Sequence, residues 1–82
     1  MDETRVAILG IIISDPECVE DINALLHEAN QYIVGRMGIP YRARGINIIC
    51  VVVDAPQDVI SSLSGRIGRL PGANCKVTYS QK

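Results

Sequence analysis

The chain repeats one pattern in its two halves: an apolar run, a short turn with an acid and a proline, and then a stretch of helical periodicity. The first apolar run covers Val6–Ile13 and the second covers Ile46–Val53. Residues 14–17 (Ser-Asp-Pro-Glu) follow the first run and residues 54–57 (Asp-Ala-Pro-Gln) follow the second. Each half has room for one more strand after its helix. We therefore predict a single βαββαβ domain over residues 1–82.

Apolar residues at steps of three and four predict the two helices. The first helix is expected from Pro16 to about Gln31, with Ser14 or Asp15 as its N-cap. The second is expected from Pro56 to about Leu70, and Gly72 ends it.

The four predicted strands differ in how many apolar faces they carry. Both runs named above are apolar at even and odd positions, which is typical of central strands. The stretch from Cys75 to Ser80 alternates, and the stretch from Tyr32 to Tyr41 contains two glycines and a proline, so both suit edges. With right-handed crossovers, the fold class is α+β: a ferredoxin-like four-stranded antiparallel sheet of order 4-1-3-2, with two helices on one face.

Two helices cover only one side of such a sheet, yet the central strands are apolar on both sides. A chain of 82 residues also has a small core. We therefore expect a homo-oligomer, a dimer or a tetramer, that buries the other side. The alternative is a monomer whose sheet is half exposed. The residues predicted to form the interface are Leu9, Ile11, Ile13, Ile49, Val51 and Val53.

Composition excludes several classes of function. The net charge of −1 predicts neither direct nucleic-acid binding nor attraction to an anionic membrane. Acidic residues precede the short first apolar run, so it is predicted to be neither a signal peptide nor a membrane span. Three cysteines without CxxC spacing predict a cytoplasmic location, with no disulfide framework, metal site or cofactor.

No nucleophile has an identifiable base and orienting partner in the sequence, so we predict that the chain is not an enzyme. His27 is expected on the solvated side of the first helix, and Cys50 and Cys75 are expected in the core. Cys18 is the remaining candidate, because the first turn of a helix can lower the pKa of a thiol.

The segment from residue 64 to residue 72 (Ser-Gly-Arg-Ile-Gly-Arg-Leu-Pro-Gly) is the most unusual local sequence. Gly65 and Gly68 interrupt a helix, where glycine costs up to about 1 kcal/mol relative to alanine. Close packing is the favoured reason, and a ligand or a neighbouring subunit is the alternative. Arg66 and Arg69 are suited to pair with acids across an interface or to hold an anionic effector.

The order of these segments, with Ile-Val-Gly-Arg-Met-Gly-Ile-Pro-Tyr at 33–41 and the glycine-rich helix, resembles the ACT-like family of proposed regulators of the iron-only hydrogenase system. That family is similar to the C-terminal domain of the nickel-responsive repressor, which implies a homo-oligomer. ACT domains bind small effectors near the first strand–helix turn. The resemblance thus adds Ser14 and Asp15 to Gly65, Arg66, Gly68 and Arg69 as candidate ligand-binding residues.

The chain also departs from these relatives. Glu17 follows Pro16, and Gln57 follows Pro56, where ACT ligand turns usually carry glycine. The repressor's histidine-rich nickel site and its DNA-binding segment have no counterpart.

Three hypotheses therefore stay open. The first is a stand-alone regulator that senses a small molecule or a partner at its oligomer interface. The second is an assembly or docking module without a ligand. The third is a thiol enzyme that uses Cys18.

Overall fold

The structure is a computed structural model that describes residues 3–81. Four strands and two α-helices follow one another along the chain in the order β-α-β-β-α-β, joined in part by single 3-10 turns. The strands are β1 (Arg5–Ile13), β2 (Ile33–Tyr41), β3 (Ile46–Ala55) and β4 (Ala73–Tyr79). The helices are α1 (Val19–Glu28) and α2 (Gln57–Gly68), and the 3-10 turns are η1 (Pro16–Cys18), η2 (Asn30–Tyr32) and η3 (Arg42–Arg44).

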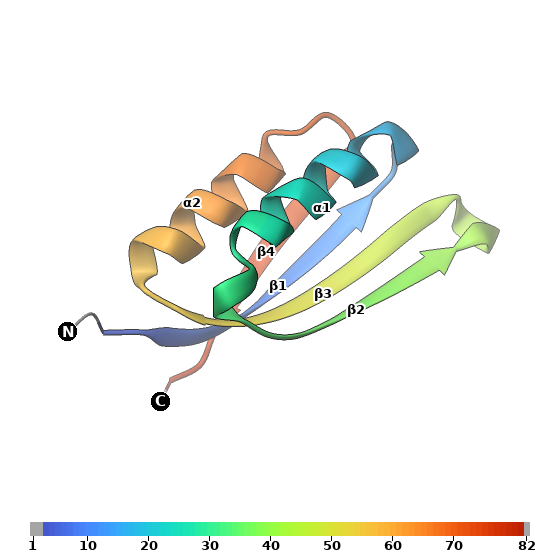
Figure 1. Cartoon of the computed structure of the whole chain (residues 1–82). Helices are drawn as coiled ribbons and strands as arrows, with labels where there is room; N and C mark the ends of the chain where they lie inside the picture. The colour runs from blue at the N-terminus through green and yellow to red at the C-terminus, as the bar shows by residue number, and fades with distance from the viewer. Residues whose placement is uncertain (1–2, 82) are drawn as a thin grey trace.

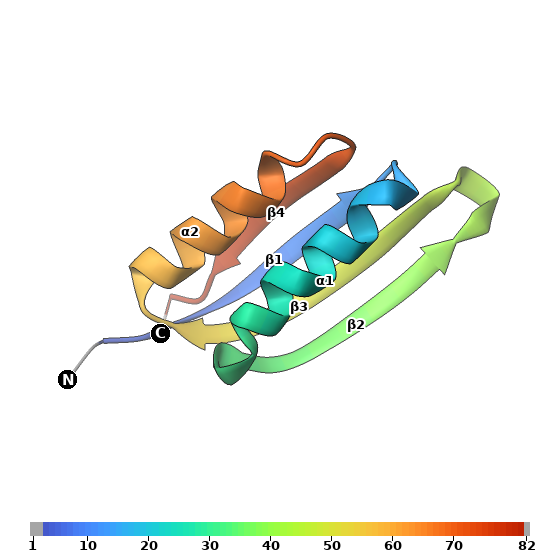
Figure 2. The ribbon, with the colours of Figure 1, turned by 45° about the horizontal axis from the view of Figure 1, so that its top comes forward.

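The strands form one antiparallel sheet in the order β2-β3-β1-β4. This is the predicted order 4-1-3-2 written from the other edge, so the predicted fold class is confirmed. Both helices lie on the same side of the sheet (Figure 1). In the turned view, α2 runs over β4 and β1, α1 runs beside it, and β2 lies at the edge beyond the helices (Figure 2).

The core lies between the sheet and the helices. Odd-numbered residues of β1 and β3 point into it and pack against one face of each helix. Fifteen buried apolar residues form this core, and none of the buried side chains in the described part of the chain is polar or charged. The apolar stripe of each helix therefore has its partner within the same chain.

This arrangement corrects the predicted interface residues. All six residues predicted to form it are at most 6% exposed and lie under the helices. The prediction was wrong because both faces of the central strands are apolar, so alternation alone did not show which face the helices cover. The uncovered side is formed by the even-numbered residues of β1 and β3 instead. The six residues that were predicted to form the interface, and that lie in the core, are Leu9, Ile11, Ile13, Ile49, Val51 and Val53.

Both α-helices are shorter than the sequence predicted. The Asp15 carboxylate accepts a hydrogen bond from the Glu17 N–H at 3.0 Å, so Asp15 is the cap, but the first turn is the 3-10 turn η1. The predicted helix through Gln31 ends at Glu28, and η2 follows. The second helix ends at Gly68 with Arg69 as its C-cap, and Gly72, with a φ of +84°, lies in the turn that leads into β4.

A polar cluster ties one end of the sheet to α2. The Arg5 guanidinium donates to Gln57 Oε1 at 2.6 Å and lies over the Tyr79 ring, 4.2 Å from its centroid. Gln57 Nε2 donates to the Tyr79 hydroxyl at 2.8 Å. These contacts join β1, the first turn of α2 and β4, and no pattern in the sequence predicted them.

The glycines of α2 are not required by packing within the chain. A Cβ at Gly65 would meet only the end of the Arg69 side chain, at 3.9 Å, and a Cβ at Gly68 would have no atom within 4 Å. The expectation of close packing inside the protomer is therefore wrong. Gly72 is different, because its Cβ would collide with Asp15.

These two environments predict opposite effects for the same substitution. Gly65→Ala should raise the free energy of unfolding by up to about 1 kcal/mol, the helix-propensity difference. Gly72→Ala should lower it by about 1–2 kcal/mol from backbone strain alone, and by more from the collision with Asp15. Urea unfolding of both variants at one protein concentration measures this difference. A destabilising Gly65→Ala would contradict the open environment of that residue.

Candidate functional site

The side of the sheet away from the helices is apolar over three neighbouring strands. Cross-strand partners lie on the same face of a sheet, so the register of β1, β2 and β3 assigns its members. Ile8 is 47% exposed and Met37 is 55% exposed, and no described segment covers them. We call this surface the outer apolar face. It comprises Val6, Ile8, Ile12, Met37, Ile39, Tyr41, Ile46, Ile48, Cys50 and Val52.

The fourth strand is polar on this side. Asn74, Lys76 and Thr78 of β4 pair in register with the outward-facing residues of β1 and are exposed. The outer apolar face therefore ends at β1 on one side. On the other side it reaches the free edge of β2.

The predicted ligand turn is fastened to the loop that precedes β4. The Ser14 backbone N–H and hydroxyl both donate to the Gly72 carbonyl oxygen, at 2.7 and 3.2 Å. Asp15 occupies the space that a Cβ of Gly72 would need. The two predicted segments, 14–15 and 65–72, are thus brought together although they are far apart in sequence.

Two shallow hollows lie beside this junction, on the helix side of the molecule. One is lined by Asp15, Glu17, Cys18, Asp21, Leu70 and Pro71. The other is lined by Asp21, Ala24, Leu25, Arg66, Arg69 and Leu70. They share two residues, so carboxylates and both predicted arginines line one continuous stretch of surface.

Not every predicted ligand residue lines these hollows. Asp15, Arg66 and Arg69 do, whereas Ser14 is engaged with Gly72, and neither Gly65 nor Gly68 is a lining residue. Both helices lie on one side of the sheet (Figure 1). The hollows are lined by residues of these helices and of the turns beside them, so they lie on the side opposite the outer apolar face. A single interface formed by that face therefore does not contain them.

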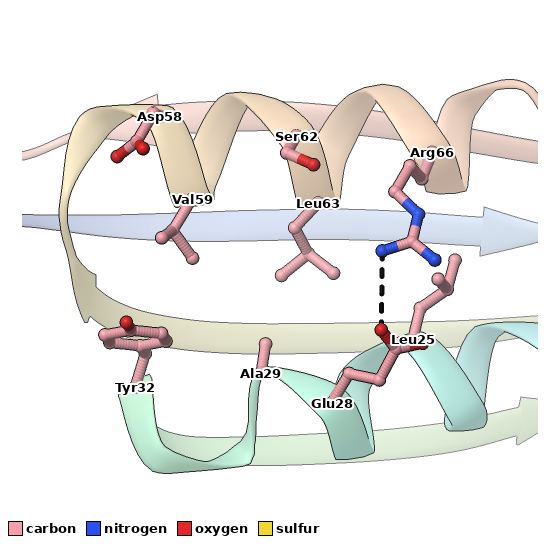
Figure 3. A pocket seen from close by; sticks show the side chains of 9 residues that line it. All are labelled: Leu25, Glu28, Ala29, Tyr32, Asp58, Val59, Ser62, Leu63 and Arg66. Carbon is pink, nitrogen blue, oxygen red and sulfur yellow. Dashed lines mark ion pairs between the residues drawn. The ribbon is translucent and has the colours of Figure 1, made fainter.

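A further groove runs between the two helices, as Figure 3 shows, and the sequence did not indicate it. Its volume is about 310 Å³, near the lower limit for small-molecule sites. Leu25, Val59 and Leu63 point into it, and Arg66 reaches across to Glu28, with an N–O distance of 3.5 Å (Figure 3). Both side chains of this pair are exposed, so it contributes little to stability. Arg66 lines both this groove and the neighbouring hollow.

The cysteines lie in three different environments. Cys18 is 5% exposed, and its Sγ is 3.2 Å from the Asp15 carbonyl oxygen. Burial raises the pKa of the Cys18 thiol, and the Asp15 carboxylate raises it further. This is opposite to the lowering of the pKa by a helix start that the thiol-enzyme hypothesis requires. Cys75 points toward the core, and burial raises its pKa as well, whereas Cys50 lies on the outer apolar face.

Other chemistry finds little support in the described residues. His27 is exposed near the end of α1. Within residues 3–81, no three histidine, cysteine or acidic side chains gather as metal ligands would. Neither of the two described helices has the length and apolar character needed to cross a membrane.

The fold and these surfaces define a small ferredoxin-like α+β protein with an uncovered apolar sheet face and charged hollows beside its helices. Residues 5–77 match the TM1266-like family, whose description reads "Iron-only hydrogenase system regulator, putative". The chain belongs to this family, as the resemblance predicted.

Two solved structures are similar. TM1266 from Thermotoga maritima is 31% identical, with a TM-score of 0.92, over 96% of this chain and all of that one. A formyltetrahydrofolate deformylase from Pseudomonas putida KT2440 is 19% identical, with a TM-score of 0.68, over 94% of this chain and 29% of that one. The second likeness shows the fold alone. No curated protein matches the chain.

The environment of Cys18 predicts that its thiol reacts slowly with alkylating reagents. Because its pKa is raised, less thiolate should be present at neutral pH than in a free cysteine. Iodoacetamide labelling followed cysteine by cysteine by mass spectrometry should therefore show Cys18 reacting about tenfold or more slowly than free cysteine at pH 8. The labelling rate of Cys18 should rise only above the ordinary thiol pKa. A labelling rate that already reaches its maximum below pH 7 would restore the thiol-enzyme hypothesis.

Proposed function

We propose that this chain is a non-catalytic, cytoplasmic regulator of the iron-only hydrogenase system that works as a homo-oligomer assembled through its outer apolar face. The observation that carries the proposal is that nothing within residues 3–81 covers this face. Apolar patches of more than a few hundred Å² are rare on monomers and mark interaction sites. The family description supports the regulatory role.

The size of the face suits a stable contact. Three strands about 4.8 Å apart, rising about 3.3 Å per residue over about eight residues, project roughly 400 Å². Burying two such faces at about 25 cal/mol per Å² yields about 20 kcal/mol as an upper figure. Association costs roughly 4–15 kcal/mol. The balance favours oligomerisation.

The effector of this regulator is a small anion or zwitterion bound at the hollow beside Arg69. Arg66 already has Glu28 as a partner. Among residues 3–81 no acidic side chain forms an ion pair with Arg69, whose guanidinium lies beside the position that a Cβ of Gly65 would take. Arginine suits carboxylate and phosphate groups because its planar fork donates two parallel hydrogen bonds. The absence of a Cβ at Gly65 leaves room for a ligand at this point.

Replacing Ile8 by Glu should dissociate the oligomer. Ile8 lies on the outer apolar face, and burying an unpaired carboxylate there is costly. Sedimentation equilibrium at micromolar concentration should show an oligomer for the wild-type chain and single protomers for Ile8→Glu.

The matched control is Thr78→Glu. Thr78 pairs with Ile8 in the register but lies on the polar strand β4. The Thr78→Glu substitution should leave the number of subunits in the oligomer unchanged. A wild-type chain that sediments as one protomer would overturn the proposed assembly.

Ligand binding predicts a thermal shift that depends on Arg69. A compound at 100 times its Kd stabilises by about 2.7 kcal/mol, which corresponds to a rise in Tm of roughly 10 °C or more for so small a domain. The panel comprises inorganic phosphate, the amino acids and short dicarboxylates. Arg69→Ala should abolish the shift, whereas Arg44→Ala, in the distant turn η3, should retain it. If no compound of the panel shifts the Tm of an oligomeric wild-type chain, the function that remains is the docking module.

A further inference from the structure

Gly10 occupies a position that its own protomer does not explain. It lies in the middle of the central strand β1, on the same side of the sheet as Ile8 and Ile12. A Cβ there would meet only the Lys76 carbonyl oxygen, at an ordinary 3.9 Å. Its φ is not positive. Glycine weakens a strand interior, and it often marks a place where another group approaches closely.

Gly35 leaves a second gap on the same side of the sheet as Gly10. It pairs with Val52 on β3, and a Cβ there would have no atom within 4 Å. The two glycines lie on opposite sides of β3, one on β1 and one on β2. Each therefore leaves a gap next to the central strand of the outer apolar face.

The residues across β3 from these gaps are large and exposed. Cys50 has Met37 on one side and Gly10 on the other, which makes one row across three strands. In the next row, Val52 has Gly35 on one side and Ile8 on the other. In each row a protruding side chain and a gap lie at the same separation from β3.

We propose that a second copy of this chain packs its outer apolar face on this one about a two-fold axis parallel to β3, so that Met37 fills the hollow at the partner's Gly10 and Ile8 fills the hollow at the partner's Gly35. This arrangement rests on the homo-oligomer of the proposed function and specifies how it is built. In a two-fold contact each pairing occurs twice, once on each side of the axis. The two sheets then stack in the aligned orientation, offset by their twist.

The shape of the apolar surface fixes the axis at β3. The apolar residues lie on β3 and on the strands to either side of it, whereas Asn74, Lys76 and Thr78 make β4 polar. Rotation about β3 places β1 on the partner's β2 and leaves β4 at the rim. An axis along β1 would instead lay polar β4 over apolar β3. Interfaces place their charged residues at such rims.

The area is also sufficient for this occupant. The accessible surface of a face with protruding side chains exceeds its projection, and the lower limit for specific interfaces is about 600 Å² per partner. The side chains that protrude from the three apolar strands, such as Met37 and Ile8, bring the contact toward that range. The third row contributes as well, because Ile39 meets the partner's Ile12 in the same arrangement.

An exchange of side chains tests the arrangement. Gly10→Met and Met37→Gly should each weaken the dimer by about tenfold or more. The double variant, Gly10→Met with Met37→Gly, restores one large and one small residue at each contact and should recover the wild-type Kd to within about threefold. Sedimentation equilibrium measures the Kd, and far-UV circular dichroism verifies that each protomer is folded.

Lys76→Met is the matched control, because it adds the same side chain beside Gly10 on the polar strand. It should not weaken the dimer. If a Gly10 variant fails to fold, the second pair, Ile8→Gly with Gly35→Ile, repeats the test independently.

The outcomes separate the two proposals. A wild-type chain that stays monomeric overturns the oligomer and this arrangement together. A dimer that Ile8→Glu dissociates, but that neither exchange restores, overturns only the arrangement. Recovery by the double variant supports it.

Discussion

The structure depends on one packing constraint: two helices shield only one face of a four-stranded sheet. The odd-numbered residues of β1 and β3 satisfy that constraint by packing under α1 and α2, and they form nearly all of the sheet's share of the core. The even-numbered residues of the same strands are almost as apolar, but no other described segment covers them. A small domain gains much of its possible stability from such a surface only when a second body buries it. The same constraint therefore shapes both the fold and its interactions.

Most of the architecture follows from the sequence because it depends on local signals. Periodicity, prolines and the acidic turns place the six main elements, and the one-sided pattern of Cys75, Val77 and Tyr79 identifies an edge strand. Which face of the central strands lies under the helices does not follow, because in Val6–Ile13 and Ile46–Val53 both the even-numbered and the odd-numbered positions are mostly apolar. Weak signals were present: Gly10 and Asp54 both fall in the even set, and neither suits a position under a helix.

The helix-side site is predictable only in part, for a different reason. The acidic turn and the arginines of α2 are visible in the sequence, but their meeting depends on contacts across the whole chain. Ser14 bonds to Gly72, which lies 58 residues further on, and only the completed sheet brings the two together. The groove between the helices, with its Arg66–Glu28 pair, arises from side chains whose spacing gives no sign of it.

The outer apolar face and the hollow beside Arg69 lie on opposite sides of the sheet, so any communication between them needs an element common to both. β1 is that element. Its even-numbered residues belong to the outer apolar face, its odd-numbered residues pack under the helices, and the turn that follows it bonds to the loop after α2. A ligand shifts an assembly equilibrium only as far as it binds one state better than the other. A ligand in this hollow would act on the outer apolar face through the lining residues, which lie on α1, on α2 and in the adjoining turns, and through their contacts with β1.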